Sequence, residues 1–141
     1  MNASLAAFVE ELKNQGLTSG QDFTLLDFQF GQPSAYPVVL GALCATKSPI
    51  FVAGESTSMV SETADCLSPG FVTAYTNGAM NENHHKHCAS EQAAGRVNIL
   101  QNHAGKWTLL KAAVVDPQDR RPASQMIAQE ISERLKKKPL P

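Results

Sequence analysis

The order of its apolar segments is the feature that most limits what this chain of 141 residues can fold into. Helical patterns stand near both ends and around residues 84–100, and strand-like segments lie between them. The first helical pattern has apolar side chains at the spacing i, i+3, i+4, i+7: Leu5, Phe8, Val9 and Leu12. We expect this helix to end at Gly16 and the last helix to open at Pro122.

Short segments rich in β-branched and aromatic residues predict the strands. They are residues 23–30, 38–45, 50–53, 71–76 and 107–115. The turn-like sequence Thr46-Lys47-Ser48-Pro49 predicts that the second and third of them form a hairpin. Residues 54–69 are polar and hard to assign, although residues 58–66 are compatible with a short helix.

The order of these elements predicts an α+β fold. Several strands precede the later helices, which favours an antiparallel or mixed sheet with helices on one face. We expect about five strands and about three helices, arranged as a single pair of layers. The length fits one domain over residues 1–141, with residues 136–141 as a frayed tail.

Charge and composition exclude some classes of partner. The formal net charge is -1, from 12 basic and 13 acidic residues, so we expect no nucleic-acid partner. The longest apolar run, residues 36–45, is about half a membrane span. No basic residue precedes the first apolar stretch, unlike in a secretory signal. Three widely spaced cysteines, Cys44, Cys66 and Cys88, favour free thiols, with Cys44 as a packing residue, and a cytoplasmic protein without a membrane partner.

The richest chemical stretch is Asn83-His84-His85-Lys86-His87-Cys88-Ala89-Ser90-Glu91. Imidazole, thiolate and carboxylate groups are the ligands of zinc and other transition metals. On a helix, four of these side chains share one face at the spacing i, i+3, i+4, i+7: His84, His87, Cys88 and Glu91. The pattern makes the first three candidate metal ligands and Glu91 a candidate catalytic acid or base.

A helix over residues 84–100 would turn this cluster away from its own apolar residues. Those apolar residues lie together on one side: Ala89, Ala93, Val97 and Leu100. At about 100° per residue, the cluster is centred roughly 170° from them. We therefore expect the cluster to face solvent, with a metal or catalytic site and a covered subunit interface as the alternatives. The geometric argument lapses if residues 84–88 form a loop.

A strand-to-turn transition at Gly54-Glu55-Ser56-Thr57-Ser58 offers a second candidate site. A serine on a sharp turn after a strand can act as a nucleophile, as in the Gly-x-Ser-x-Gly elbow. Here Ser58 stands where that pattern has its second glycine. Ser56 is therefore a candidate catalytic residue, and a plain loop is the alternative.

Two stretches are similar to zinc-dependent cytidine deaminases. Residues 39–43 followed by 50–54 resemble the first hairpin of that family, and Cys88-Ala89-Ser90-Glu91 resembles its Cys-Ala-Glu helix start. The resemblance implies a zinc-bound thiolate or imidazole and a proton-shuttling glutamate. The chain departs from the family where an extra residue separates Cys88 from Glu91. It also lacks the family's Pro-Cys-x-x-Cys, because no cysteine follows Cys88.

The chain contains no complete catalytic motif, and this sets the functional expectation. We expect a small domain that binds a small ligand or a protein partner without catalysis, as a homo-oligomer. The alternative is a zinc-dependent hydrolase or deaminase-like enzyme built on the His84, His87, Cys88 and Glu91 stretch. A serine hydrolase using Ser56 is the third possibility.

Overall fold

The structure is a computed structural model that describes residues 3–117 and 121–137. The chain divides into two compact units, Met1–Val39 and Leu40–Pro141. That the whole chain forms one domain stays a prediction. None of the helices in the described ranges combines the length and the apolar character that crossing a membrane requires.

The first unit holds helix α1 (Ala3–Asn14) and the beginning of α2. The predicted end of α1 is confirmed: Gly16 has φ +86°, and its N–H donates to the carbonyl oxygen of Lys13 at 2.8 Å. The strand predicted over residues 23–30 is wrong, because only an isolated bridge between Ser19 and Phe23 forms there. Alternating apolar residues suit a strand, but a strand also needs a neighbour for its backbone groups.

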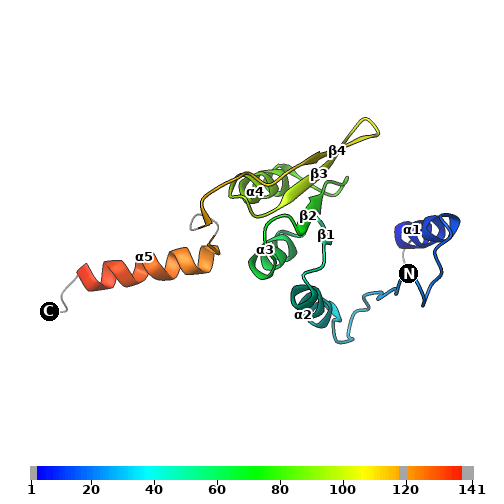
Figure 1. The fold of residues 1–141 in the computed structure, drawn as a ribbon, viewed down its shortest axis with the longest axis horizontal. Helices are drawn as coiled ribbons and strands as arrows, with labels where there is room; N and C mark the ends of the chain where they lie inside the picture. The colour runs from blue at the N-terminus through cyan, green and yellow to red at the C-terminus, as the bar shows by residue number, and fades with distance from the viewer. Residues whose placement is uncertain (1–2, 118–120, 138–141) are drawn as a thin grey trace. The chain divides into compact units, whose positions relative to one another are not determined.

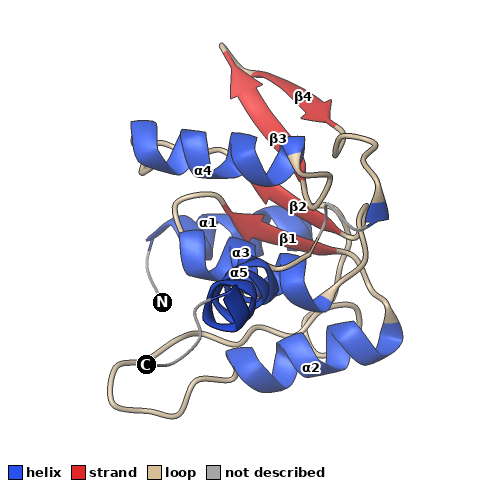
Figure 2. Cartoon of the chain, turned by 90° about the vertical axis from the view of Figure 1, so that its left-hand side faces the viewer, coloured by secondary structure: helices blue, strands red, loops and turns tan. Residues whose placement is uncertain are grey.

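The second unit is built around a mixed sheet of four strands (Figure 1). They are β1 (Ile50–Ala53), β2 (Val72–Tyr75), β3 (Asn98–His103) and β4 (Lys106–Leu110). Their spatial order is β1-β2-β3-β4; the first three are parallel, and β4 runs antiparallel to β3. Figure 2 shows the four strands, in red, with α4 running along one side of them.

One face of this sheet is covered by helices α3 (Thr57–Cys66) and α4 (Glu82–Ala93). Each helix connects two parallel strands and packs back on the sheet, as crossover connections do, and the two helices also contact each other. The buried apolar side chains between helices and sheet form the core: Val52, Val60, Ala64, Leu67, Val72, Ala74, Cys88, Val97 and Ile99.

The opposite face of the sheet is called the open face below. Successive residues of a strand point to opposite faces, and residues paired in register point to the same face. Phe51 therefore shares a face with Thr73, and Tyr75 shares that face with Leu100. The open face carries nine strand residues, of which Thr73 is buried: Phe51, Ala53, Thr73, Tyr75, Asn98, Leu100, Asn102, Trp107 and Leu109. In the described residues, the helices that pack extensively on the sheet are α3 and α4, and both lie on the other face.

The predicted hairpin is wrong, because residues 38–45 belong to helix α2 (Tyr36–Thr46) and β1 pairs in parallel with β2. A uniformly apolar run has no period that separates a buried helix from a buried strand. Two local features favour the helix. Pro37 suits a first helical turn, and the hydroxyl of Ser34 accepts the N–H of Tyr36 at 3.2 Å.

The helix predicted over residues 84–100 is shorter than expected, since α4 ends at Ala93 and β3 begins at Asn98. The final helix, α5 (Ala123–Lys137), begins as predicted, with the carbonyl oxygen of Pro122 accepting the N–H of Gln125 at 2.9 Å. Of the tail predicted over residues 136–141, residues 138–141 lie outside the described residues. The α+β class and the mixed sheet are confirmed, with four strands and five helices in the described ranges instead of about five and three.

Candidate functional site

His84, a predicted metal ligand, takes part in the N-terminal cap of α4. The side-chain oxygen of Asn81 accepts the N–H of His84 at 3.1 Å. In return, the Asn81 N–H donates to Nδ1 of His84 at 3.0 Å. This reciprocal pair is a capping box in which an imidazole takes the usual place of Glu or Gln. The Nδ1 lone pair of His84 therefore accepts a capping hydrogen bond at the N-terminus of α4.

Cys88, the second predicted ligand, lies in the core with 2% of its surface exposed. Its thiol donates to the carbonyl oxygen of Gly54 at 3.6 Å. Burial raises the pKa of this thiol, and the nearby charge of Glu91 raises it further. The thiol is therefore held protonated, whereas zinc takes a thiolate.

The Gly54 turn is shaped by packing. A Cβ at Gly54 would lie 2.8 Å from the side chain of Met80 and 3.0 Å from the carbonyl oxygen of Tyr75. Ser56, the candidate nucleophile, is the N-cap residue of α3, but its side chain makes no capping hydrogen bond. The strand-turn-helix context of an elbow is thus present around Ser56. Gly54, the glycine of this turn, leaves room for the side chain of Met80 and the backbone of Tyr75.

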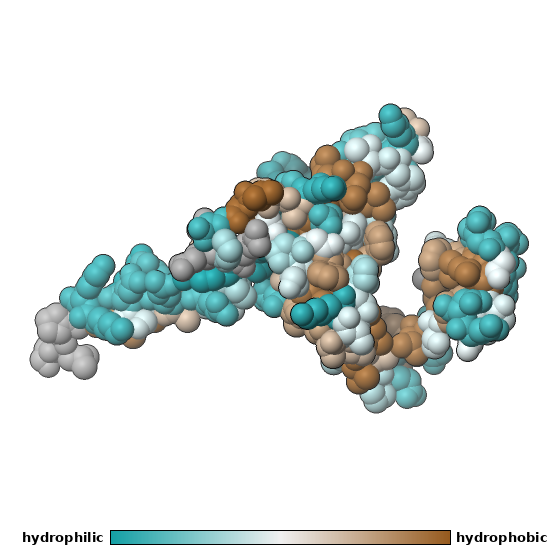
Figure 3. Space-filling view, viewed as in Figure 1, coloured by the Kyte–Doolittle hydropathy of each residue, from teal (hydrophilic) through white to brown (hydrophobic). Residues whose placement is uncertain are grey.

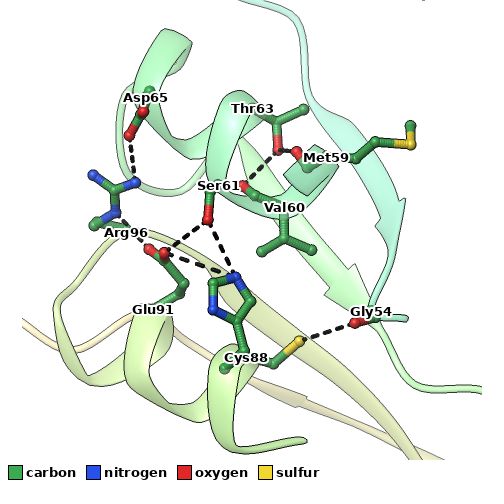
Figure 4. A network of polar contacts seen from close by, with 10 residues as sticks. Gly54, Met59, Val60, Ser61, Thr63, Asp65, Cys88, Glu91 and Arg96 are labelled. Carbon is green, nitrogen blue, oxygen red and sulfur yellow. Dashed lines mark hydrogen bonds and ion pairs between the residues drawn. The ribbon is translucent and has the colours of Figure 1, made fainter. Parts of the chain in front are cut away.

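His87 and Glu91, one turn apart on α4, both meet Ser61 on α3 (Figure 4). The Ser61 hydroxyl donates to Oε1 of Glu91 at 3.3 Å, and the Ser61 hydroxyl oxygen also lies 3.2 Å from Nε2 of His87. A serine has one hydroxyl proton. With that proton directed at Glu91, the Ser61 oxygen is left to accept a hydrogen bond from the His87 tautomer that carries its hydrogen on Nε2.

Arg96 extends this contact into a network that joins α3, α4 and the start of β3. Its Nε donates to Oε2 of Glu91 at 2.5 Å, and Nη2 donates to Oδ1 of Asp65 at 2.5 Å. The Arg96 side chain is 9% exposed, so its charge is neutralised inside the protein by two carboxylates. We call Ser61, Asp65, His87, Glu91 and Arg96 the α3–α4 polar network; Figure 4 draws its contacts as dashed lines.

The expectation that the His/Cys/Glu stretch faces solvent is wrong for Cys88, which is buried, and the other three candidates, His84, His87 and Glu91, are half-buried. The exposed fractions of the side chains are 27% for His87 and 13% for Glu91, and Cys88 is buried. The error comes in part from the helix length. Of the four apolar residues that oriented the helix, Val97 and Leu100 follow its end, so they say nothing about which side of α4 faces the core. The other two, Ala89 and Ala93, lie on α4 but are exposed.

The geometry of the polar network limits its chemistry. A serine nucleophile needs a base that accepts its proton. The Ser61 hydroxyl donates to Glu91, a carboxylate that is already paired with Arg96, and the role of His87 toward Ser61 depends on the tautomer of its ring. The three predicted ligands point to separate partners: Asn81, Ser61 and Gly54. Across residues 3–117 and 121–137, no three His, Cys, Asp or Glu side chains gather in a way that could hold a metal ion.

A cleft of about 350 Å³ lies beside this network. Its volume falls at the lower end of the range for small-molecule sites. Its lining includes network members and the first turn of α5: Ser61, Asp65, Glu91, Arg96, Ser124 and Met126. Its wall carries the carboxylates of Asp65 and Glu91 and the guanidinium groups of Arg96 and Arg121, so the formal charges of the lining balance. The cleft thus offers a ligand shape and hydroxyl groups more than an unbalanced charge.

Sequence reasoning missed Ser61, Asp65 and Arg96. A weak signal existed, because Ser61 and Asp65 have the same i, i+4 spacing on the expected helix over residues 58–66 as His87 and Glu91 have on theirs. Nothing in the sequence says that these two faces meet. That contact follows from the parallel order of the strands, which puts both helices on one face of the sheet.

Comparisons with known proteins add no relative: no family model matches the chain, and searches of curated proteins and of solved structures find no significant match.

Proposed function

We propose that this chain is a non-catalytic interaction domain that associates with a second copy of itself through the open face of its sheet. The observation that supports the proposal is the exposure of large apolar side chains there. The exposed fractions are 64% for Phe51, 52% for Trp107 and 49% for Leu109. Figure 3 shows apolar side chains, in brown, gathered over the β3 and β4 part of the sheet.

The composition of the open face differs from that of a face that stays in water. A sheet with one solvated face normally alternates apolar and polar residues, with the polar ones outward. On this sheet, both faces carry apolar residues. The neighbouring β1 residues Phe51 and Val52 are an aromatic and a β-branched residue pointing in opposite directions. Apolar side chains grouped in this way mark surfaces that bind a partner.

The absence of charge on the open face favours a second copy as the partner. In a two-fold symmetric contact each surface meets itself, so like charges would repel across the interface. The nine strand residues of the open face are all uncharged, including Asn98 and Asn102 on β3. Aromatic residues such as Phe51, Tyr75 and Trp107 are enriched at interface centres.

The zinc-dependent hydrolase or deaminase-like alternative has weaker support. Its three ligand candidates serve as a helix cap, a partner of Ser61 and a buried thiol. The segment similar to the deaminase hairpin is a helix followed by a strand. A small-ligand role is compatible with the cleft beside the polar network, but no unbalanced polar group there selects a ligand class. For the compartment, we propose the cytoplasm, because the three cysteines are unbridged thiols.

The test is the oligomeric state of Trp107→Lys. This substitution places a charge on the open face, so we expect the dimer dissociation constant to rise roughly tenfold or more. Thr108→Lys is the matched control, since Thr108 is exposed on the same strand but points to the opposite side. Sedimentation velocity over a concentration series measures both. Trp107 is the single tryptophan, so its emission should shift to the blue as the dimer forms.

Two results would refute the proposal. One is a wild-type protein that sediments as a monomer at every concentration. The other is a dimer that Thr108→Lys weakens as much as Trp107→Lys does, because the interface would then lie elsewhere.

A further inference from the structure

Helix α5 carries apolar side chains that no other element buries within the described part of the chain. Ile127, Ile131 and Leu135 stand at the spacing i, i+4, i+8, so they form one stripe about 80° wide on the helix. Their exposed fractions are 58%, 53% and 70%, and α5 has no buried residue. A helix of 15 residues is marginal in water by itself and depends on the packing of its apolar side. The stripe therefore indicates a contact beyond the single chain.

We propose that α5 of one copy packs across the open face of a second copy, while the α5 of that second copy packs across the open face of the first. This inference rests on the proposed association through the open face, and it names the segment that covers the face. Each chain brings one apolar sheet face and one apolar helix stripe. The reciprocal exchange covers all four of these surfaces, and its two-fold symmetry ends the assembly at two chains.

The start of α5 lies on the opposite side of the sheet from the open face. Ser124 and Met126, in its first turn, line the cleft beside Ser61 and Glu91. Those two residues belong to α3 and α4, the helices that cover the other face of the sheet. A helix that begins there does not lie across the open face of its own sheet. A second copy can supply this cover without moving the first turn of α5 out of the cleft.

The stripe and the open face match in length and in charge. At 1.5 Å per residue, α5 is about 22 Å long, and four strands about 4.8 Å apart make a face roughly 19 Å across. The stripe is uncharged, as are the nine strand residues of the open face. Beside the stripe, Glu130 and Arg134 neutralise each other in an ion pair of 2.6 Å. Packing the stripe on the sheet therefore buries no unpaired charge.

The test is an exchange of charge between the open face and α5, read as the dimer dissociation constant in sedimentation velocity at low salt. Trp107→Lys and Ile131→Glu should each raise this constant roughly tenfold or more. In the double variant, the two new charges are opposite and lie in the same helix-to-sheet contact, so they attract. Its dissociation constant should fall at least roughly threefold below that of either single variant.

Two controls separate this contact from other effects. Gln125→Glu adds the same charge to α5 about 120° around the helix from Ile131, and it should dimerise as tightly as the wild type. Because no residue of α5 is buried, Ile131→Glu should leave the urea midpoint of the dilute, monomeric protein unchanged. Weaker association of Ile131→Glu is then a loss of contact between chains.

Two results would overturn the inference and leave the association through the open face in place. The first is that Ile131→Glu dimerises as tightly as Gln125→Glu. The second is that the double variant binds no tighter than the single variants, because like charges meet across the interface when open face packs on open face and α5 on α5. A wild-type chain that stays monomeric would remove the proposed association and this inference together.

Discussion

The two faces of the sheet are made from the same strands, yet their surroundings differ. Val52 on β1 is 2% exposed beneath the helices, whereas its neighbour Phe51 is 64% exposed on the open face. Both residues are strongly apolar, so apolar character alone does not decide which face is buried. The crossover helices decide it, because both cross on the same side. A sheet that is apolar on both faces is usually covered on both, and among the described residues of the second unit the helices that pack extensively on the sheet, α3 and α4, cover one face.

The largest effect is expected where the covering helices are held to the sheet. Arg96→Ala leaves the buried carboxylate of Glu91 without its counter-charge, so the free energy of unfolding should fall by about 3 kcal/mol. Asp65→Asn should cost less, because the Asp65 side chain is 40% exposed. Urea unfolding at fixed pH measures both. Equal losses of unfolding free energy in the two variants would mean that burial does not determine how much each charged group contributes to stability.

The next effect compares adjacent residues of β1. Val52→Ala removes two methyl groups from the covered face and should lower the free energy of unfolding by about 1–2 kcal/mol. Phe51→Ala removes a larger side chain from the open face, yet it should change the stability of the monomer by about 0.5 kcal/mol or less. Urea unfolding at concentrations below dimerisation measures this pair. A larger cost for Phe51→Ala would mean that the open face is covered within one chain.

The smallest effect concerns the thiol under the helices. The pKa of folded Cys88 is raised by burial and by Glu91, so the folded state prefers the protonated thiol. This contribution is complete below the ordinary thiol pKa and is lost as the pH rises through the folded value. The free energy of unfolding should therefore fall with pH above about 9, and Cys88→Ala should show a flatter decline. Identical slopes would contradict the buried, protonated thiol.

Local signals were sufficient for several elements of the fold. The spacing of apolar residues and a following Gly16 predicted α1, and the polar segment over residues 58–66 was recognised as compatible with α3. The strand predicted over residues 107–115 is present but ends at Leu110. These elements depend mainly on side chains close in sequence, which is the information that periodicity and capping rules use.

The errors arose where distant contacts decide the structure. Residues 36–46 are mostly apolar, so their hydrophobic pattern does not distinguish a helix from a strand, and the local signals at Ser34 and Pro37 were not used. The predicted orientation of His87 and Glu91 was wrong because the helix was ended seven residues too late, at Leu100, and because the small residues Ala89 and Ala93 on α4 are exposed instead of core-facing. Arg96 was not singled out, because its partners stand at residues 65 and 91 and meet it only after two crossovers have formed.

The match between strand order in space and in sequence bears on how the second unit is made by the ribosome. Each new strand, from β2 to β4, adds beside the strand synthesised just before it. No strand waits for a partner that is translated much later, and contacts between neighbours in sequence form quickly. The unit can therefore grow from β1 outward, with each crossover helix closing over the strand pair that it has just completed.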